Sequence, residues 1–300
     1  MNILITGGNG FLGSSVVKKL IKENHNVLVL SKKNNNIKSI INNCKFLPYY
    51  IDEPENYIKD IQLFSPDVIL LFGWWGSNNR KDVNNMNQYY KNIPSHIKFL
   101  ELINKFSYKT KIIGVGSFAE YGSYEIPITE ECVEKPNNLY GLSKLTFKKY
   151  SEMFCNQNNI KWAWIRPCFI YGPNDVKTRL IPTVIGKCLK NENVELDECN
   201  KIIDYLYIDN FADIVYEIIH LNLCGVYNVC SGNKYPLRSI IDLIVKLTNT
   251  NSKIVYNKNI NVQENNNVIC GDNEKIKKYI NDLSLLCIED GMEKTIKFYD

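Results

Sequence analysis

The 300-residue sequence has few of the features that mark metal sites, secretion or membranes. It has three histidines, and its ten cysteines are scattered without a C-x-x-C pair, which favours buried reduced thiols over disulfides or metal ligands. No apolar run approaches the roughly 20 residues that span a bilayer, and the N-terminus lacks the pattern of a secretory signal. A net charge of +4 is too small to argue for nucleic acid. We therefore expect a cytoplasmic protein with no metal, no membrane contact and no nucleic-acid partner.

The first 170 residues alternate short apolar runs with helix-like segments. Continuous apolar strands between helices are typical of a parallel sheet covered on both faces. The pattern predicts an α/β fold with a doubly wound parallel sheet, the Rossmann arrangement, of about seven strands. Strands are expected at 2–6, 26–30, 45–51, 67–72, 111–115 and 162–166, with helices at 11–23, 86–106 and 140–157.

Beyond residue 170 the pattern is less regular. We expect residues 1–170 to form a dinucleotide-binding domain, joined by later strands from about 202–230, and residues 171–300 to form a smaller, interwoven C-terminal α/β lobe that binds substrate. The expected elements of this part are helices at 179–190, 210–220 and 237–247, and strands at 204–208 and 225–229.

A glycine-rich segment, T-G-G-N-G-F-L-G at 6–13, follows the first strand directly and opens a helix. Gly7 would permit the tight turn, Gly10 would let a pyrophosphate approach the backbone, and Gly13 would allow close helix–strand packing. Amides at the helix start, including those of Phe11 and Leu12, would then hold the anion. A purely structural turn would not need three glycines at this spacing, so the segment predicts a dinucleotide site.

A second motif, Y-G-L-S-K, places Tyr140 and Lys144 four residues apart, on one face of a helix. The ammonium can lower the pKa of the tyrosine and hydrogen-bond a cofactor ribose. The spacing also occurs by chance, but Ser117 stands directly after a predicted strand, about two dozen residues earlier. Three further segments follow in order: R-P-C-F-I-Y-G-P at 166–173, D-Y-L-Y-I-D-N at 204–210 and G-V-Y-N-V at 225–229.

Together these motifs resemble the extended short-chain dehydrogenases/reductases, the NAD(P)-dependent epimerase/dehydratase family, over residues 1 to about 245. The resemblance implies a nucleotide-diphosphate sugar as substrate and a catalytic triad of Ser117, Tyr140 and Lys144. It also implies that Asp52 hydrogen-bonds the adenine amine. The other residues expected to bind the cofactor on this basis are Gly73 and Pro167.

Ser31, Lys32 and Lys33 end the second strand, where NAD-preferring members of that family carry an acidic residue. Two cations and a hydroxyl would bind a 2′-phosphate, so we expect NADP(H) as the cofactor, with NAD less favoured. The alternative is a solvated basic turn in which at most one lysine matters.

The expected substrate contacts rest mainly on position. Trp74 and Trp75, at the end of the fourth strand, would wall a sugar pocket or serve the core. Ile203 replaces the arginine that grips the diphosphate in many members. That role would pass to another cation, with Arg179 and Arg238 as candidates, or backbone amides would hold the diphosphate. The remaining expected substrate contacts are Arg80, Ser117, Glu120 and Tyr121.

Phe118 and Ala119 follow Ser117, where the family's dehydratases carry two acids. Dehydration is therefore disfavoured. Reduction of a C4 ketone and C4 epimerisation remain, and the basic strand end favours reduction. The sequence resembles the branch that includes CDP-abequose and CDP-paratose synthases, which act on nucleotide-linked 4-keto-6-deoxy sugars. Two alternatives stay open: an epimerase with tightly bound NAD, and a cofactor-sensing regulatory protein without turnover.

The resemblance also implies a homodimer formed through the helices at 86–106 and 140–157. Their apolar residues could serve a core or an interface equally. Those singled out are Phe99, Leu102, Leu145 and Phe154.

Overall fold

The computed structural model describes residues 1–32, 44–77, 82–106, 110–124, 127–257, 268–280 and 283–300. Lys33 and Arg80 lie outside these ranges. The chain divides into two units whose segments alternate along the sequence. Unit 1 comprises Met1–Gly122, Val133–Pro167 and Ala212–Tyr227, and unit 2 comprises Ser123–Cys132, Cys168–Phe211 and Asn228–Asp300.

The predicted doubly wound fold is confirmed. The central sheet has seven strands in the order β11-β6-β5-β4-β1-β2-β3, and neighbouring strands pair in parallel. Sequence order reverses beside β1, which is the switch point where α/β proteins bind ligands. The strands are β1 (Asn2–Thr6), β2 (Asn26–Leu30), β3 (Lys45–Leu47), β4 (Val68–Leu71), β5 (Lys111–Val115), β6 (Trp162–Pro167) and β11 (Gly225–Val229).

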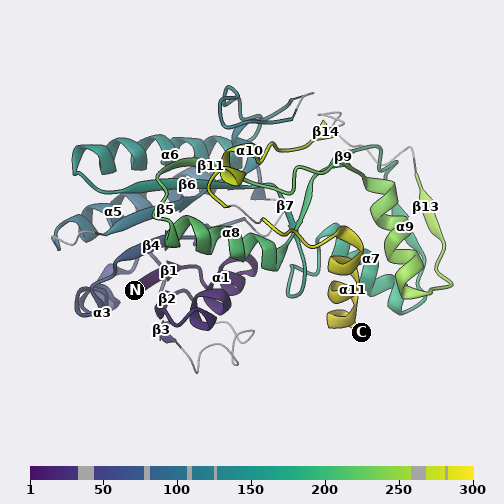
Figure 1. Cartoon of the computed structure of the whole chain (residues 1–300), viewed down its shortest axis with the longest axis horizontal. Coiled ribbons are helices and arrows are strands. Elements are labelled where there is room, and N and C mark those ends of the chain that lie inside the picture. Colours follow the sequence, from purple (N-terminus) through teal and green to yellow (C-terminus); the bar gives the residue numbers. More distant parts are fainter. Residues whose placement is uncertain (33–43, 78–81, 107–109, 125–126, 258–267, 281–282) are drawn as a thin grey trace. The chain divides into compact units, whose positions relative to one another are not determined.

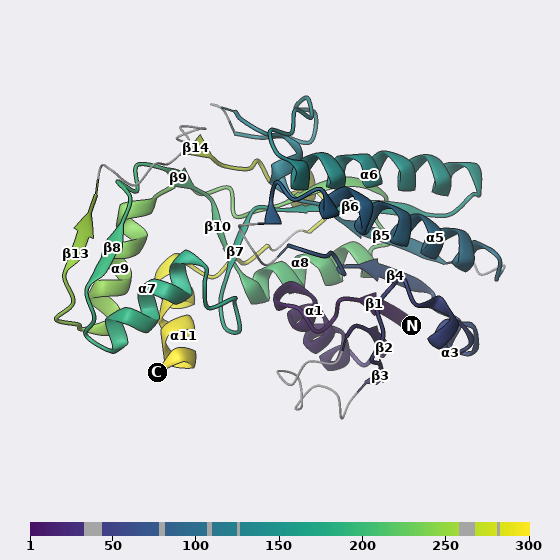
Figure 2. The same ribbon diagram turned by 180° about the vertical axis from the view of Figure 1, so that it is seen from behind.

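Helices cover both faces of this sheet. Figures 1 and 2 show α5 and α6 on one side of the strands, with α1 and α8 on the other. On the first side Ile61, Phe99 and Phe147 pack into a core with the sheet residues Leu4 and Ile69. The helical elements of this part are α1 (Phe11–Lys22), η2 (Pro54–Asn56), α3 (Ile58–Phe64), α4 (Asn87–Tyr90), α5 (Asn92–Asn104), η4 (Phe118–Glu120), α6 (Leu139–Gln157) and α8 (Ile208–His220).

The helix expected at 86–106 is two helices, α4 and α5, with Lys91 between them. Pro94 is the reason in the sequence: it lacks the N–H that would continue the ladder, and it is tolerated only in the first turn of a helix. Of the apolar residues singled out on these helices, Phe99 and Leu145 belong to the core.

Unit 2 is built from short strands and four helices among its described residues. Of the strands at 202–230, β11 joins the large sheet, whereas β9 and β10 pair in small sheets of unit 2. The elements are β7 (Phe169–Tyr171), α7 (Leu180–Leu189), β8 (Val194–Leu196), β9 (Ile202–Ile203), β10 (Tyr205–Tyr207), β12 (Tyr235–Pro236), α9 (Leu237–Thr248), β13 (Ile254–Tyr256), β14 (Val268–Ile269), α10 (Glu274–Lys277) and α11 (Ile288–Tyr299).

A buried carboxylate holds the loops of unit 2 together. Asp204 accepts hydrogen bonds from the backbone N–H and the hydroxyl of Ser231, at 2.9 and 2.7 Å, and from the N–H groups of Gly232 and Gly271, at 2.9 and 3.2 Å. The aspartate that begins the D-Y-L-Y-I-D-N motif thus has a structural role.

Across the described residues, no helix combines the length and apolar character needed to cross a bilayer.

Candidate active site

The glycine loop is packed so tightly that side chains are excluded from it. Gly7 has φ +65°, and a Cβ there would lie 2.6 Å from the Cα of Gly73. A Cβ on Gly13 would lie 2.4 Å from the Gly7 carbonyl oxygen. The structure therefore brings the loop, the start of α1 and the end of β4 together, as the motif predicts.

The loop also fits a dinucleotide diphosphate. Gly10 is the N-cap of α1 and offers no side chain to its first turn, whose N–H groups have no acceptor inside the helix. Among the described residues, a Cβ on Gly10 would meet one atom within 4 Å, the Gly7 carbonyl oxygen at 3.3 Å. A group at this helix end would therefore contact backbone amides directly.

The end of β2 is tied to this loop. The side-chain amide of Asn9 donates to the carbonyl oxygen of Lys32 at 2.8 Å. Lys32 itself is exposed, with its ammonium 6.0 Å from the ring centroid of Tyr50, and Ser31 is half-buried. One of the two predicted lysines thus lies on the strand end beside the glycine loop. Asp52, expected at the adenine, is exposed.

Lys144 is the most deeply buried member of the predicted triad. It is 3% exposed, and its ammonium donates to the Val115 carbonyl oxygen at 2.7 Å. The ammonium also lies 3.8 Å from the ring centroid of Trp74 and 5.9 Å from that of Tyr140. Burial lowers the pKa of Lys144 to about 7, and the carboxylate of Glu120 opposes that shift.

Tyr140 and Ser117 stand at the starts of two helical elements. Tyr140 is half-buried in the first turn of α6, and its N–H donates to the carbonyl oxygen of Val83 at 2.9 Å. Ser117 follows β5 after one residue, Gly116, and caps η4, where its hydroxyl oxygen accepts from the Ala119 N–H at 3.2 Å. A Cβ on Gly141 would lie 2.2 Å from the Ala119 carbonyl oxygen, so α6 packs against the Ser117 turn.

One side of this site is aromatic and uncharged. The Trp74 indole donates to the side-chain oxygen of Gln88 at 3.0 Å, and its ring centroid lies 4.9 Å from that of His96. The His96 ring nitrogens lie 2.8 Å from the carbonyl oxygens of Asn92 and Gly73. Burial lowers the pKa of His96 to about 4, with Lys144 adding to the effect, which favours the neutral imidazole; the two backbone contacts oppose the shift.

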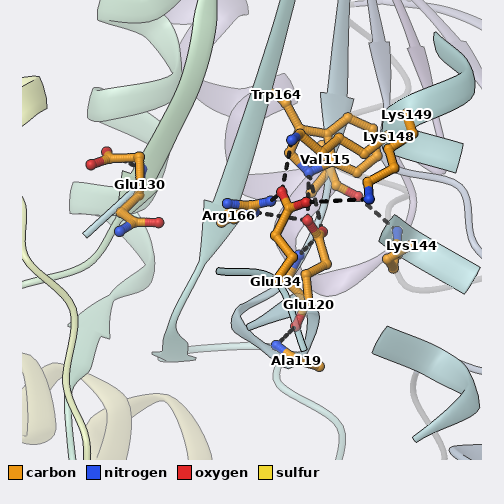
Figure 3. Close-up of polar contacts among 12 residues, drawn as sticks. Val115, Ala119, Glu120, Glu130, Glu134, Lys144, Lys148, Lys149, Trp164 and Arg166 are labelled. Carbon is orange, nitrogen blue, oxygen red and sulfur yellow. Dashed lines mark hydrogen bonds and ion pairs between the residues drawn. The ribbon is translucent and has the colours of Figure 1, made fainter. Parts of the chain in front are cut away.

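The other side contains a chain of largely buried charges. Glu120 is fully buried and accepts from the Ser117 N–H at 2.9 Å, from the Trp164 indole at 3.1 Å and from the Arg166 Nε at 2.7 Å. Arg166 also pairs with Glu134, which the Lys148 ammonium of α6 contacts at 2.7 Å. Figure 3 shows the two carboxylates converging on Arg166 below Trp164.

The expected substrate contacts divide three ways. Trp74 and Trp75 stand half-buried after β4, and the Lys91 ammonium lies 5.1 Å from the Trp75 ring centroid. Glu120 and Tyr121 are fully buried within unit 1, a placement suited to holding other side chains rather than to meeting a ligand. Arg179 belongs to unit 2, where it pairs with Asp175 at 3.1 Å.

Several polar residues beside the triad were not expected from the sequence. Arg166 stands in a motif that was quoted, but its ion pairs could not be predicted because their partners are 32 and 46 residues away. No sequence signal distinguishes Gln88, Asn92 or Glu134 from surface residues.

Pro167, which the resemblance places at the cofactor, ends β6 and is buried.

A dinucleotide loop at the switch point of a parallel sheet, with Ser117, Tyr140 and Lys144 on neighbouring elements, defines a nicotinamide-dependent enzyme of the short-chain dehydrogenase/reductase class. Residues 3–230 match the model of the NAD dependent epimerase/dehydratase family. The chain belongs to this family, which confirms the resemblance inferred from the motifs.

Several relatives carry the names of sugar-nucleotide enzymes. The chain is 27% identical over 271 residues to a putative UDP-glucose 4-epimerase of Methanocaldococcus jannaschii, covering 85% of each chain. It is 25% identical to the dTDP-6-deoxy-L-talose 4-dehydrogenase (NAD(+)) of Aggregatibacter actinomycetemcomitans, covering 86% of this chain and 94% of the relative. It is 26% identical to a CDP-abequose synthase of Salmonella muenchen, covering 85% and 83%.

The fold is also that of solved structures. The UDP-glucose 4-epimerase of Thermotoga maritima, solved with UDP-glucose, superposes with a TM-score of 0.90 over 100% of this chain and 98% of that one. At 22% identity, this likeness establishes the fold. The chain is therefore an enzyme of the nucleotide-sugar epimerase, dehydratase and reductase group that works with a nicotinamide cofactor.

Proposed function

We propose that this enzyme uses NADPH to reduce the C4 ketone of a nucleotide-linked 4-keto-6-deoxy sugar. The observation that carries the proposal is the turn after Ser117. Phe118 and Ala119 provide no acid there, and the one carboxylate of the turn, Glu120, is buried and paired with Arg166. A dehydration needs an acid and a base beside the sugar, so this turn favours chemistry that only adds or removes hydride.

The roles of the three residues follow from their chemistry. A bound nicotinamide would supply the hydride to the carbonyl carbon. Tyr140 donates its phenolic proton to the sugar oxygen as negative charge develops there. Ser117 donates a hydrogen bond to the same oxygen, and the Lys144 ammonium favours the phenolate that Tyr140 becomes.

The proposed cofactor preference rests on the end of β2. Lys32 is exposed beside the glycine loop. Residues 31–33, at the strand end, include no acid that could accept a hydrogen bond from a ribose hydroxyl. A cation at this position suits a 2′-phosphate. The Aggregatibacter relative is named for NAD(+), so the preference must be measured directly. We expect tighter binding of NADPH than NADH, and Lys32→Asp should narrow the difference by about tenfold.

C4 epimerisation is the second candidate. The Methanocaldococcus relative is named a putative UDP-glucose 4-epimerase, and the same triad would serve in both directions of hydride transfer. An epimerase would retain NAD and consume no cofactor.

Turnover with purified protein separates the two candidates. NADPH consumption is followed with CDP-, GDP-, UDP- and dTDP-linked 4-keto-6-deoxy sugars, and C4 epimers are followed without added cofactor. The proposal expects NADPH oxidation with at least one ketone. Interconversion of epimers without NADPH oxidation would assign the protein as an epimerase, and binding without either reaction would favour a cofactor sensor.

The remaining site assignments stay predictions. We propose Trp74 and Trp75 as walls of the sugar pocket and Arg179 as a diphosphate ligand in unit 2. The homodimer and the cytoplasmic location expected from the sequence are retained as predictions.

A further inference from the structure

The Glu120 side chain lies in a space within unit 1 that depends on a nearby glycine. A Cβ on the preceding Gly116 would lie 2.0 Å from the Glu120 carboxylate oxygen and 2.3 Å from the Trp164 indole nitrogen. Glycine at 116 therefore leaves the space in which the carboxylate folds back beneath the turn. This fit indicates a specific role for a carboxylate that is fully buried.

The Glu120 carboxylate holds the backbone of Ser117. Ser117 and Glu120 form a capping box, in which the Glu120 Oε1 accepts from the Ser117 N–H at 2.9 Å. The same oxygen accepts from Trp164, and the other oxygen accepts from the Arg166 Nε. An ionised carboxylate has lone pairs for all three donors, whereas an amide has only one acceptor oxygen.

The charges continue from Glu120 to the helix that carries Tyr140 and Lys144. Arg166 stacks its guanidinium 4.2 Å from the Tyr121 ring centroid and pairs with Glu134. Glu134 then pairs with Lys148, which is 11% exposed and lies one helical turn beyond Lys144. Hydrogen bonds from Lys148 and Arg166 outweigh burial and lower the pKa of Glu134, which keeps this carboxylate ionised.

We propose that Glu120 is a positioning residue, which fixes Ser117 relative to Tyr140 and Lys144 through the buried chain Glu120–Arg166–Glu134–Lys148. This series of ion pairs begins at the Ser117 turn and ends on helix α6. It therefore connects the two elements whose spacing determines the geometry of the triad. Figure 3 shows Glu120 lying between Arg166 and the Ala119 backbone. Glu120 thereby acts through Ser117 and not on the substrate.

Glu120→Gln is the appropriate test because it keeps the shape and removes the charge. The amide oxygen would turn to Arg166, the charged donor, and the amide N–H₂ would then face the N–H of Ser117. Ser117 would lose its acceptor and shift. We expect kcat to fall about 10- to 100-fold with KM changed less than threefold, in the assay of the reaction that the unmodified enzyme performs.

A double-variant cycle distinguishes positioning from general damage. If Glu120 acts through Ser117, then Glu120→Gln combined with Ser117→Ala should be no slower than Ser117→Ala alone, within about threefold. Ser151→Ala is the matched control: it removes a buried hydrogen bond from α6, that between the Ser151 hydroxyl and the Trp162 indole at 3.1 Å. It should leave kcat unchanged. Multiplicative losses in the cycle would overturn the proposal.

A second measurement does not depend on turnover. The inference rests on the proposed function for its kinetic test, but amide hydrogen exchange reports the Ser117 contact directly. Exchange at residues 116–121 should be at least about tenfold faster in Glu120→Gln than in Ser151→Ala or the unmodified protein. Equal protection in all three would overturn the positioning role. Absence of turnover in the unmodified protein would overturn the proposed function alone.

Discussion

The two sides of helix α6 near Lys144 treat charge in opposite ways. On one side Trp74, His96 and Phe147 pack their rings within 4.9 to 6.1 Å of one another, and burial lowers the pKa of His96, the ionisable ring among them. On the other side a carboxylate, Glu120, is buried completely; burial raises its pKa, and the ion pair with Arg166 opposes that shift. Lys144 lies between the two sides and is affected by both.

The comparison teaches which effect dominates at Lys144. Desolvation by the uncharged surroundings disfavours the ammonium, whereas Glu120 favours it, and the net result is a pKa lowered to about 7. Because the pKa of Lys144 lies near 7, a small change in its environment shifts the balance between ammonium and amine. Lys144 can therefore assist proton transfer at Tyr140. Burial among uncharged groups therefore lowers the pKa of Lys144, whereas Glu120 raises it.

The largest effect should come from Tyr140, the proton donor that Lys144 assists. Tyr140→Phe keeps the ring and removes the hydroxyl, so kcat should fall about 10²–10⁴-fold with cofactor affinity nearly unchanged. Ser117→Ala should cost less, because one hydrogen bond to the substrate oxygen would remain. Lys144→Ala should weaken both turnover and cofactor binding. Rates measured by NADPH oxidation decide this, and full activity in Tyr140→Phe would remove the triad from the account.

The charged side predicts a shift in the pH profile. If the ammonium of Lys144 is the active form, kcat/KM, which reports the free enzyme, should fall as the pH rises through about 7. Glu120→Gln removes the carboxylate that favours the ammonium, so the pKa of Lys144 drops and this limb should move to lower pH by about one unit. A pH profile from 5 to 9 tests the sign, and an unchanged or higher limb would contradict it.

The aromatic side predicts a smaller shift. Trp74→Leu keeps an apolar side chain but removes the ring that lies 3.8 Å from the ammonium. Loss of a cation–π contact should lower the pKa of Lys144 by about half a unit, again moving the limb to lower pH. A limb that moves to higher pH would mean that hydration of the ammonium outweighs the lost ring contact.

The longer elements of the fold could be predicted because their signals are local. The strands at 2–6, 111–115 and 225–229 end where the apolar runs end. Apart from β10, which lies within the strand predicted at 204–208, the described strands of unit 2 were not predicted, since two or three residues show no periodicity. The sequence analysis does not predict helix α11, although Ile288, Met292 and Ile296, all buried, recur at the spacing of a helix face.

The candidate site shows the same limit. The glycine loop and the Y-x-x-x-K pair are local patterns with a defined chemistry, so the sequence identifies them. The surroundings of Lys144 come from residues distant in the chain. Glu120 is predicted as a substrate contact because no sequence pattern indicates its pairing with Arg166. Burial and long-range ion pairs depend on the tertiary structure, which no local pattern encodes.

The most direct test of the proposed function follows the hydride itself. The enzyme is incubated with NADPH carrying deuterium at the transferred position of the nicotinamide, together with the 4-keto-6-deoxy sugar nucleotides, and the products are examined by mass spectrometry and NMR. We predict one deuterium at C4 of the sugar for each NADPH oxidised. Sugar epimers formed without deuterium and without NADPH oxidation would contradict the reduction and assign the triad to epimerisation.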